Sequence, residues 1–119
     1  MKITIPISVG ELLDKISILQ IKSQYTNNSY VTKEFDSLVE IAKENNIFDF
    51  EYFDQLLEVN QKLWKIEDEL RILEKSKDFS DTFVNLARSA YITNDKRASI
   101  KKNINEKYNS SFREIKIHK

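Results

Sequence analysis

The sequence predicts a mainly α-helical protein, and three observations support this fold class. The chain has 119 residues but only one glycine and one proline, the residues from which many turns are built. Long segments repeat apolar residues at intervals of three and four, the spacing of one helix face. Capping residues precede several of these segments. We therefore expect a single helical domain over residues 1–119, with two shorter helices packed on a long antiparallel helical hairpin.

The first helix is expected over residues 9–25. Ser8 and Glu11 have the spacing of a capping box, which satisfies backbone N–H groups at a helix start. Ile18 lies off the apolar face, which suggests a second contact surface. The apolar face itself consists of Val9, Leu12, Leu13, Ile16 and Leu19.

Three further helices follow, and the last two form the hairpin. Thr32 is the expected cap of a helix that reaches about residue 45. The longest helix, at 49–76, would be about 42 Å long. Ser80 is the expected cap of the last helix, which runs to about residue 109. The longest helix carries a heptad pattern made of Tyr52, Leu56, Val59, Leu63, Ile66, Leu70 and Leu73.

Both ends of the chain alternate apolar and other residues, a pattern typical of strands. Pro6 indicates an edge position for the first of them. Two short extended segments are candidates for a small two-stranded ribbon, which would need the helices as backing. The alternating residues are Ile3, Ile5 and Ile7 at the start, and Ile115 and Ile117 at the end.

Composition excludes several classes of function. Nineteen basic and nineteen acidic residues balance, so we do not expect a nucleic-acid partner. Without cysteine there is no disulfide and no thiolate metal site, and the single histidine is His118. No apolar run is long enough to span a membrane, and the first residues do not resemble a signal peptide. We expect a cytoplasmic protein without membrane contact, metal or cofactor.

A polar layer interrupts the apolar stripe of the last helix at Asn94, Arg97 and Lys101. In a hairpin this layer faces the part of the preceding helix that contains Asn60 and Trp64. One interpretation is structural: the layer fixes the register of the helices, with Asn94 bonded to Asn60 and Arg97 paired with Glu58 or Glu67. Another is that residues 93–95 cap a new helix after a break.

The third interpretation of the polar layer is a pocket for an anionic small molecule. Under it, the candidate ligand-binding residues are Trp64, Glu67, Arg71, Asn94, Arg97 and Lys101. No motif decides whether the protein is an enzyme. The favoured function is a non-catalytic helical protein-interaction or small-ligand-binding module, and the alternative is a small enzyme or sensor that acts on an anionic metabolite at this layer.

Four stretches carry a family resemblance: SVGELLDKISILQIK, LWKIEDELR, FVNLARSAYITNDKRASIKKNIN and SSFREIK. With them the chain resembles an uncharacterised family of small bacterial and phage proteins, catalogued only as a domain of unknown function. The resemblance covers most of the chain except residues 26–55. It implies a stand-alone, mostly helical cytoplasmic protein and assigns no activity.

A homodimer is expected because some apolar residues fall off the predicted stripes. These are Ile18, Ile21 and Ile72. Charge is also uneven, with residues 34–82 mostly acidic and residues 94–119 mostly basic. We expect the acidic middle to dock on the basic end of the same chain or of its twin.

Overall fold

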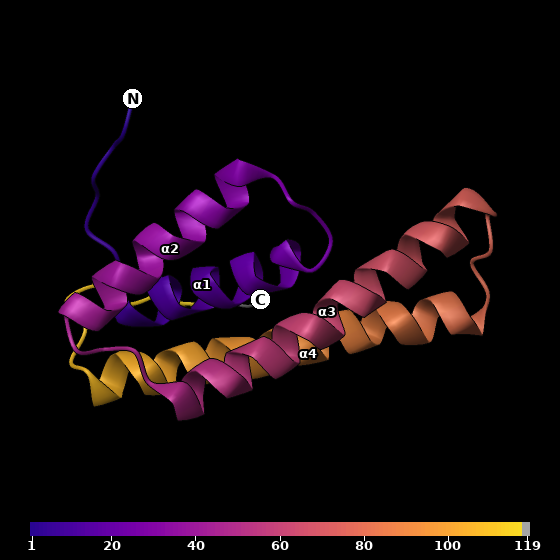
Figure 1. Cartoon of the computed structure of the whole chain (residues 1–119). Helices are drawn as coiled ribbons and strands as arrows, with labels where there is room; N and C mark the ends of the chain where they lie inside the picture. The colour runs from indigo at the N-terminus through magenta and orange to yellow at the C-terminus, as the bar shows by residue number, and fades with distance from the viewer. Residues whose placement is uncertain (118–119) are drawn as a thin grey trace.

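The protein consists of four helices, described in a computed structural model that covers residues 1–117 (Figure 1). They are α1 (Val9–Ser23), α2 (Ser29–Glu44), α3 (Phe50–Lys75) and α4 (Asp81–Lys107). The predicted mainly α-helical class is confirmed. None of these helices is both long and apolar enough to cross a membrane within residues 1–117.

The start of α2 differs from the prediction. The helix begins before Thr32 because Asn28 caps it, with the Asn28 side chain accepting a hydrogen bond of 2.8 Å from the Tyr30 N–H. Ser80 stands at the predicted start of α4, but its side chain makes no capping hydrogen bond. The sequence patterns therefore located all four helices, but they did not predict the cap residue of α2 or the missing capping bond of Ser80.

The helices are arranged around α1. α3 and α4 form the predicted antiparallel hairpin, α1 lies across its inner half, and α2 packs on α1 (Figure 1). The outer part of the hairpin extends beyond α1 and α2. We call residues 68–92, which include the connecting turn, the outer arm.

One core joins all four helices, and α1 contributes more buried residues to it than any other helix. The predicted apolar face of α1 is confirmed, since Leu12, Leu13 and Ile16 are buried there. Burying one such side chain contributes about 1.5–3 kcal/mol, so this face holds α1 on the hairpin. The buried cluster contains Leu12, Leu13, Ile16, Ala42, Phe53, Leu56 and Ile104.

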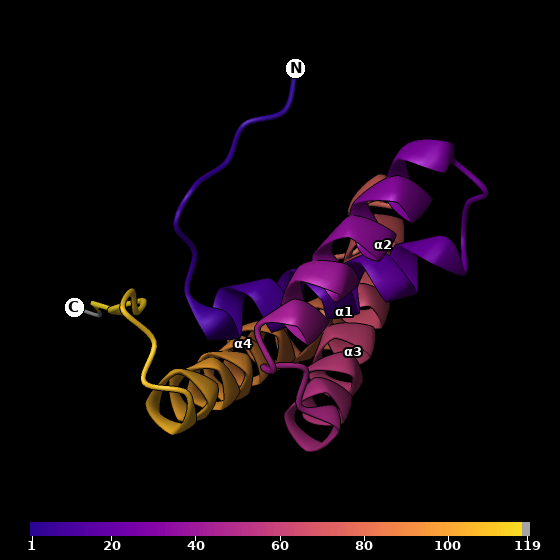
Figure 2. The same ribbon diagram turned by 60° about the vertical axis from the view of Figure 1, so that its left-hand side comes forward.

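The predicted ribbon of the two chain ends does not form within residues 1–117. No strand is present there, and the two ends leave the helices separately (Figure 2). The C-terminal segment is instead held against α4, because Glu114 contacts Lys101 at 2.9 Å. His118 lies outside the described residues.

Candidate functional site

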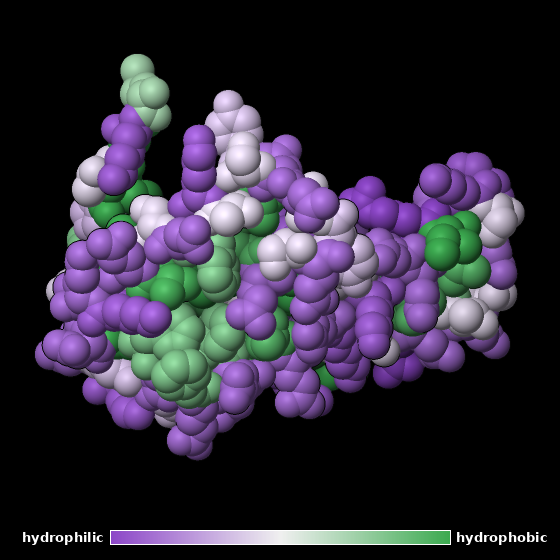
Figure 3. Space-filling view, in the orientation of Figure 1, coloured by the Kyte–Doolittle hydropathy of each residue, from purple (hydrophilic) through white to green (hydrophobic). Residues whose placement is uncertain are grey.

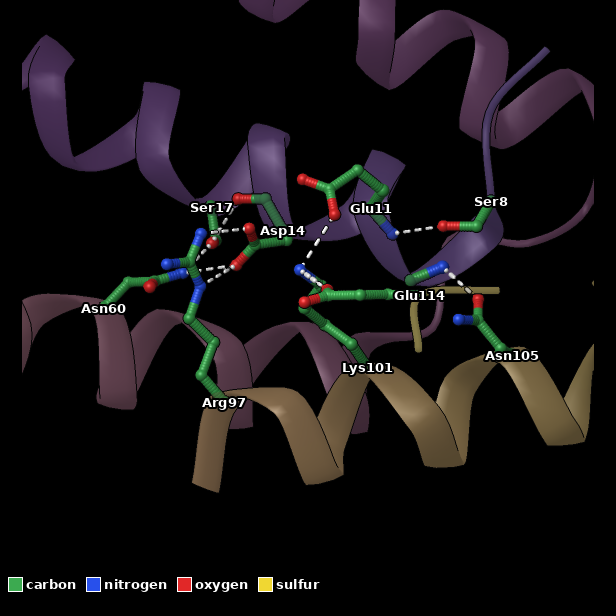
Figure 4. Close-up of polar contacts among 10 residues, drawn as sticks. Ser8, Glu11, Asp14, Ser17, Asn60, Arg97, Lys101, Asn105 and Glu114 are labelled. Carbon is green, nitrogen blue, oxygen red and sulfur yellow. Dashed lines mark hydrogen bonds and ion pairs between the residues drawn. The ribbon is translucent and has the colours of Figure 1, made fainter. Parts of the chain in front are cut away.

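Asp14 of α1 lies at the centre of a buried polar network that joins three helices (Figure 4). Its side chain is 0% exposed. The Arg97 guanidinium of α4 donates to both carboxylate oxygens, with Nε 2.9 Å from Oδ1. Asn60 of α3 donates through Nδ2 to the same Oδ1 at 2.9 Å and to the Ser17 hydroxyl at 2.8 Å. The network therefore ties α1 to both helices of the hairpin.

The pairing explains why a charge is tolerated in this interior. A buried carboxylate is costly unless it is paired and hydrogen-bonded, and a bidentate guanidinium provides strong compensation. The hydrogen bond with Asp14 in turn raises the pKa of Arg97. Arg97 therefore stays positively charged, and Asp14 compensates this charge within the protein.

Lys101 of α4 forms a second, half-buried connection to α1. Its ammonium lies 2.8 Å from Glu11 of α1 and 2.9 Å from Glu114 of the C-terminal segment. Burial lowers the pKa of Lys101, but the hydrogen bonds to these two carboxylates outweigh burial and raise it. The hydrogen bond from Lys101 also lowers the pKa of Glu114. Lys101 therefore fixes the C-terminal segment as well as α1.

The first turn of α1 lies unusually close to α4. The Gly10 N–H donates to Asn105 Oδ1 at 2.7 Å, and the Val9 N–H donates to Ser110 Oγ at 3.1 Å. These bonds satisfy N–H groups that a helix start leaves without partners. A Cβ at position 10 would lie 2.7 Å from the carbonyl oxygen of Lys101. Only glycine permits this approach without displacement of the backbone.

A further ion pair connects the start of α3 to the end of α4. Asp49 accepts a hydrogen bond of 2.6 Å from Lys107 and one of 2.7 Å from the Tyr108 hydroxyl. Partial burial raises the pKa of Asp49, but these bonds and one from the Tyr52 N–H outweigh burial and lower it to about 2. This contact agrees with the predicted docking of the acidic middle on the basic end.

Four of the six predicted ligand-binding residues line one open cleft of about 480 Å³ between α1 and the hairpin. Ile18 of α1 lines the same cleft. The indole of Trp64 stacks on Tyr25, with ring centroids 5.2 Å apart. The exposed Arg71 and Glu67 lie 3.8 Å apart as an i,i+4 pair. The four residues are Trp64, Glu67, Arg71 and Arg97.

The other two predicted residues lie elsewhere. Asn94 is half-buried in α4 and is not among the residues that line this cleft. Lys101 borders a separate cleft of about 430 Å³ beside the C-terminal segment, together with Glu114 and Arg113. The structure therefore divides the predicted set, with Arg97 and Lys101 both engaged by carboxylates.

A protein-family model of unknown function, DUF6165, matches residues 1–118. The chain belongs to this family. The match confirms the resemblance to a domain of unknown function that the four sequence stretches indicated. No curated protein and no solved structure matches the chain.

Several predicted contacts of the polar layer are wrong for this DUF6165 chain. Asn60 was predicted to bond Asn94, but it donates to Asp14 and Ser17. Arg97 binds Asp14 in place of an α3 glutamate. The predicted helix break at residues 93–95 is also wrong, because α4 continues through them. The physical reason for the changed pairing is α1, which lies on this face of the hairpin and brings its own carboxylates.

Sequence reasoning missed the polar residues of α1 that contact the hairpin. Glu11, Asp14 and Ser17 recur at intervals of three in the sequence, which places them along one side of a helix. Arg97 and Lys101 recur at an interval of four on α4. A comparison of acidic rows on one predicted helix with basic rows on another could have found these pairs.

Proposed function

We propose that this protein is a non-catalytic helical interaction module that acts as a homodimer. The supporting observation is the outer arm, where large apolar side chains are exposed and neither α1 nor α2 covers the helices (Figure 1). Figure 3 shows apolar side chains at the surface of this end of the hairpin. The exposed apolar residues of the arm are Ile72, Phe79, Val84, Tyr91 and Ile92.

A second copy of the chain is the partner that fits this arm. A two-helix arm buries only the side chains between its helices, whereas two such arms together can make a four-helix bundle. In a twofold dimer the same patch serves both subunits. Because both α3 and α4 contribute exposed apolar residues, an identical arm presents a matching set.

The exposed residues that support the dimer differ from those that the sequence indicated. Ile21 is buried within the chain and Ile18 borders the cleft beside Trp64. Ile72 is 65% exposed. Of the three isoleucines from which the sequence predicted a dimer, Ile72 is therefore the one that supports the proposal.

The polar layer supports a non-catalytic role. Its two cations are held by carboxylates of the same chain, as expected of a device that fixes helix register. The proposal includes a cytoplasmic location, which fits a chain without cysteine.

Light scattering coupled to size-exclusion chromatography tests the dimer. The chain has a mass of 14.1 kDa, and we expect the wild-type protein to show twice this value. Ile72→Glu combined with Tyr91→Glu should reduce it to the monomer mass. Ile41→Glu, a matched change of an exposed α2 isoleucine, should leave the dimer intact. A wild-type monomer at concentrations up to the millimolar range would contradict the proposal.

A further inference from the structure

A second open groove lies between α3 and α4, on a different face from the Asp14 network. It has a volume of about 650 Å³. Lys62 of α3 borders it, and Lys62 is two residues from Asn60, which places their side chains about 200° apart around the helix. We call this the lysine groove. It is bordered by Lys62, Lys65 and Lys96, with Glu58, Thr93 and Ser99.

The lysine groove has a net positive charge. Three lysines and one glutamate give a formal charge of +2 from these side chains. In the part of the chain that the structure describes, none of the three lysines has a carboxylate within 4.0 Å, unlike Lys101 and Lys107. Their N–H donors are therefore available to a ligand.

A buried hydroxyl lies beside these lysines. Thr93 is 1% exposed, and its Oγ1 has no hydrogen-bond partner among the described residues. Such orphaned groups are rare in folded proteins. Threonine in a helix divides between two χ1 rotamers, so a change of rotamer redirects the Thr93 hydroxyl. A ligand with acceptor oxygens would supply the missing partner, and the Ser99 hydroxyl is a second donor at the groove.

We propose that the lysine groove binds a small phosphorylated molecule. A phosphate monoester carries about −1.5 to −2 charges at neutral pH and three acceptor oxygens, which match the positive groove and its hydroxyls. Lysines bind phosphate as point charges. The groove volume leaves room for an organic part beside the phosphate.

This inference goes beyond the proposed homodimer. The lysine groove lies on the inner hairpin next to Ser99 and Ile100, whereas the proposed dimer uses the outer arm. Either can hold without the other. The groove also supports the alternative function, a sensor of an anionic metabolite. Arg97 and Lys101 do not support it, because carboxylates of the same chain already pair with them.

A titration of the ¹⁵N-labelled full chain with sodium pyrophosphate, followed by ¹H–¹⁵N NMR at constant ionic strength, tests the site. We expect saturable shifts of amides in residues 58–65 and 93–100, and weaker binding when salt is raised. Lys62→Gln combined with Lys65→Gln should weaken binding at least about tenfold. The matched control is Lys33→Gln with Lys43→Gln, two exposed α2 lysines, which should retain wild-type affinity. Melting curves of all variants verify their folding.

Three outcomes would overturn the inference. Pyrophosphate could produce no saturable shift, or bind with equal affinity to the groove variant and the control, or shift the amides of residues 11–17 and 101–114 without shifting those of residues 58–65. Vesicles that contain phosphatidic acid form a separate arm of the test. Binding to those vesicles without any response to pyrophosphate would assign the lysines to a membrane surface and reject a small-molecule site.

Discussion

The two faces of the α3–α4 hairpin use their cations in different ways. On the face that α1 covers, Arg97 and Lys101 are bound by Asp14, Glu11 and Glu114. In the lysine groove, Lys62 and its neighbours have no such partners within the described chain. A basic residue in the apolar stripe of a helix therefore does not by itself indicate whether its charge is paired within the fold or available to a ligand. Whether a third helix supplies a carboxylate decides if the charge stabilises the fold or remains available.

Removal of the Asp14 carboxylate, at the centre of the covered face, should destabilise the protein more than any other change considered. Asp14→Ala leaves Arg97 and Asn60 without their main acceptor in the interior. Breaking a buried ion pair from one side costs about 3–5 kcal/mol. We expect a loss of this size in the free energy of unfolding, measured by urea denaturation.

A double variant distinguishes the loss of the Asp14–Arg97 attraction from the cost of leaving one unpaired charge in the interior. Asp14→Leu combined with Arg97→Met removes both charges, so no unpaired ion is left in the interior. Such replacements are often neutral or stabilising, and we expect most of the loss caused by Asp14→Ala to be recovered. If the double variant were as unstable as the single one, the pair would not be the source of the effect.

Gly10→Ala tests the close approach of the α1 backbone to the α4 backbone on the covered face. Alanine favours a helix over glycine by about 1 kcal/mol, so an unobstructed site would gain stability. Because the added Cβ would lie 2.7 Å from the Lys101 carbonyl oxygen, we expect a net loss of about 1–3 kcal/mol. Thermal melting provides the measurement, and an increase in Tm would show that α1 is not held this closely.

The pH dependence of stability tests the pair at the other end of α4. Asp49 is 8% exposed, and its pKa in the folded protein is about 2, against an ordinary value of 3.8. A depressed carboxyl pKa contributes stability above pH 3.8 that is lost as the pH falls towards 2. The contribution is of order 1–2 kcal/mol.

Asp49→Asn should therefore flatten the fall in Tm between pH 5 and pH 2 relative to wild type. The comparison of the two curves cancels the titration of other carboxylates. Parallel curves for the two proteins would show that Lys107 does not engage Asp49 in solution.

The smallest expected effect concerns the single acid of the lysine groove. Glu58→Gln removes a negative charge beside the proposed ligand, and we expect pyrophosphate to bind about two- to threefold more tightly. Glu40→Gln on α2 is the matched control, since this exposed residue lies on a different helix. A weaker affinity for the Glu58 variant would place the anion elsewhere.

Much of the fold could be predicted from local patterns, but the periodicity of the two hairpin helices alone does not predict the pairing in the polar layer. The spacing of Leu12, Leu13 and Ile16 defines the buried face of α1, and the heptads define the hairpin. In contrast, the contact of Arg97 with Asp14 joins residues 83 positions apart, and it depends on how α1 lies across the hairpin. Helical periodicity contains no information about that packing direction.

The chain ends show a second limit of local patterns. Alternation of Ile3 and Ile5 indicates an extended backbone, but a strand also needs a partner edge. The C-terminal segment is not that partner, because Glu114 holds it to Lys101. Likewise, the Thr93 hydroxyl and the Lys62 ammonium have no partner among residues 1–117, and this depends on tertiary neighbours that the sequence pattern does not reveal.

The difference between the covered face and the lysine groove is tested most directly at two adjacent residues, Lys96 and Arg97. Each is changed to glutamine in the full chain. Unfolding free energy and pyrophosphate affinity are measured for both variants. Lys96→Gln should change stability by no more than about 0.5 kcal/mol and weaken pyrophosphate binding several-fold. Arg97→Gln should cost at least about 2 kcal/mol of stability and leave the affinity unchanged. Equal losses of stability, or a loss of affinity caused only by Arg97→Gln, would contradict the division of the hairpin into a structural face and a binding face.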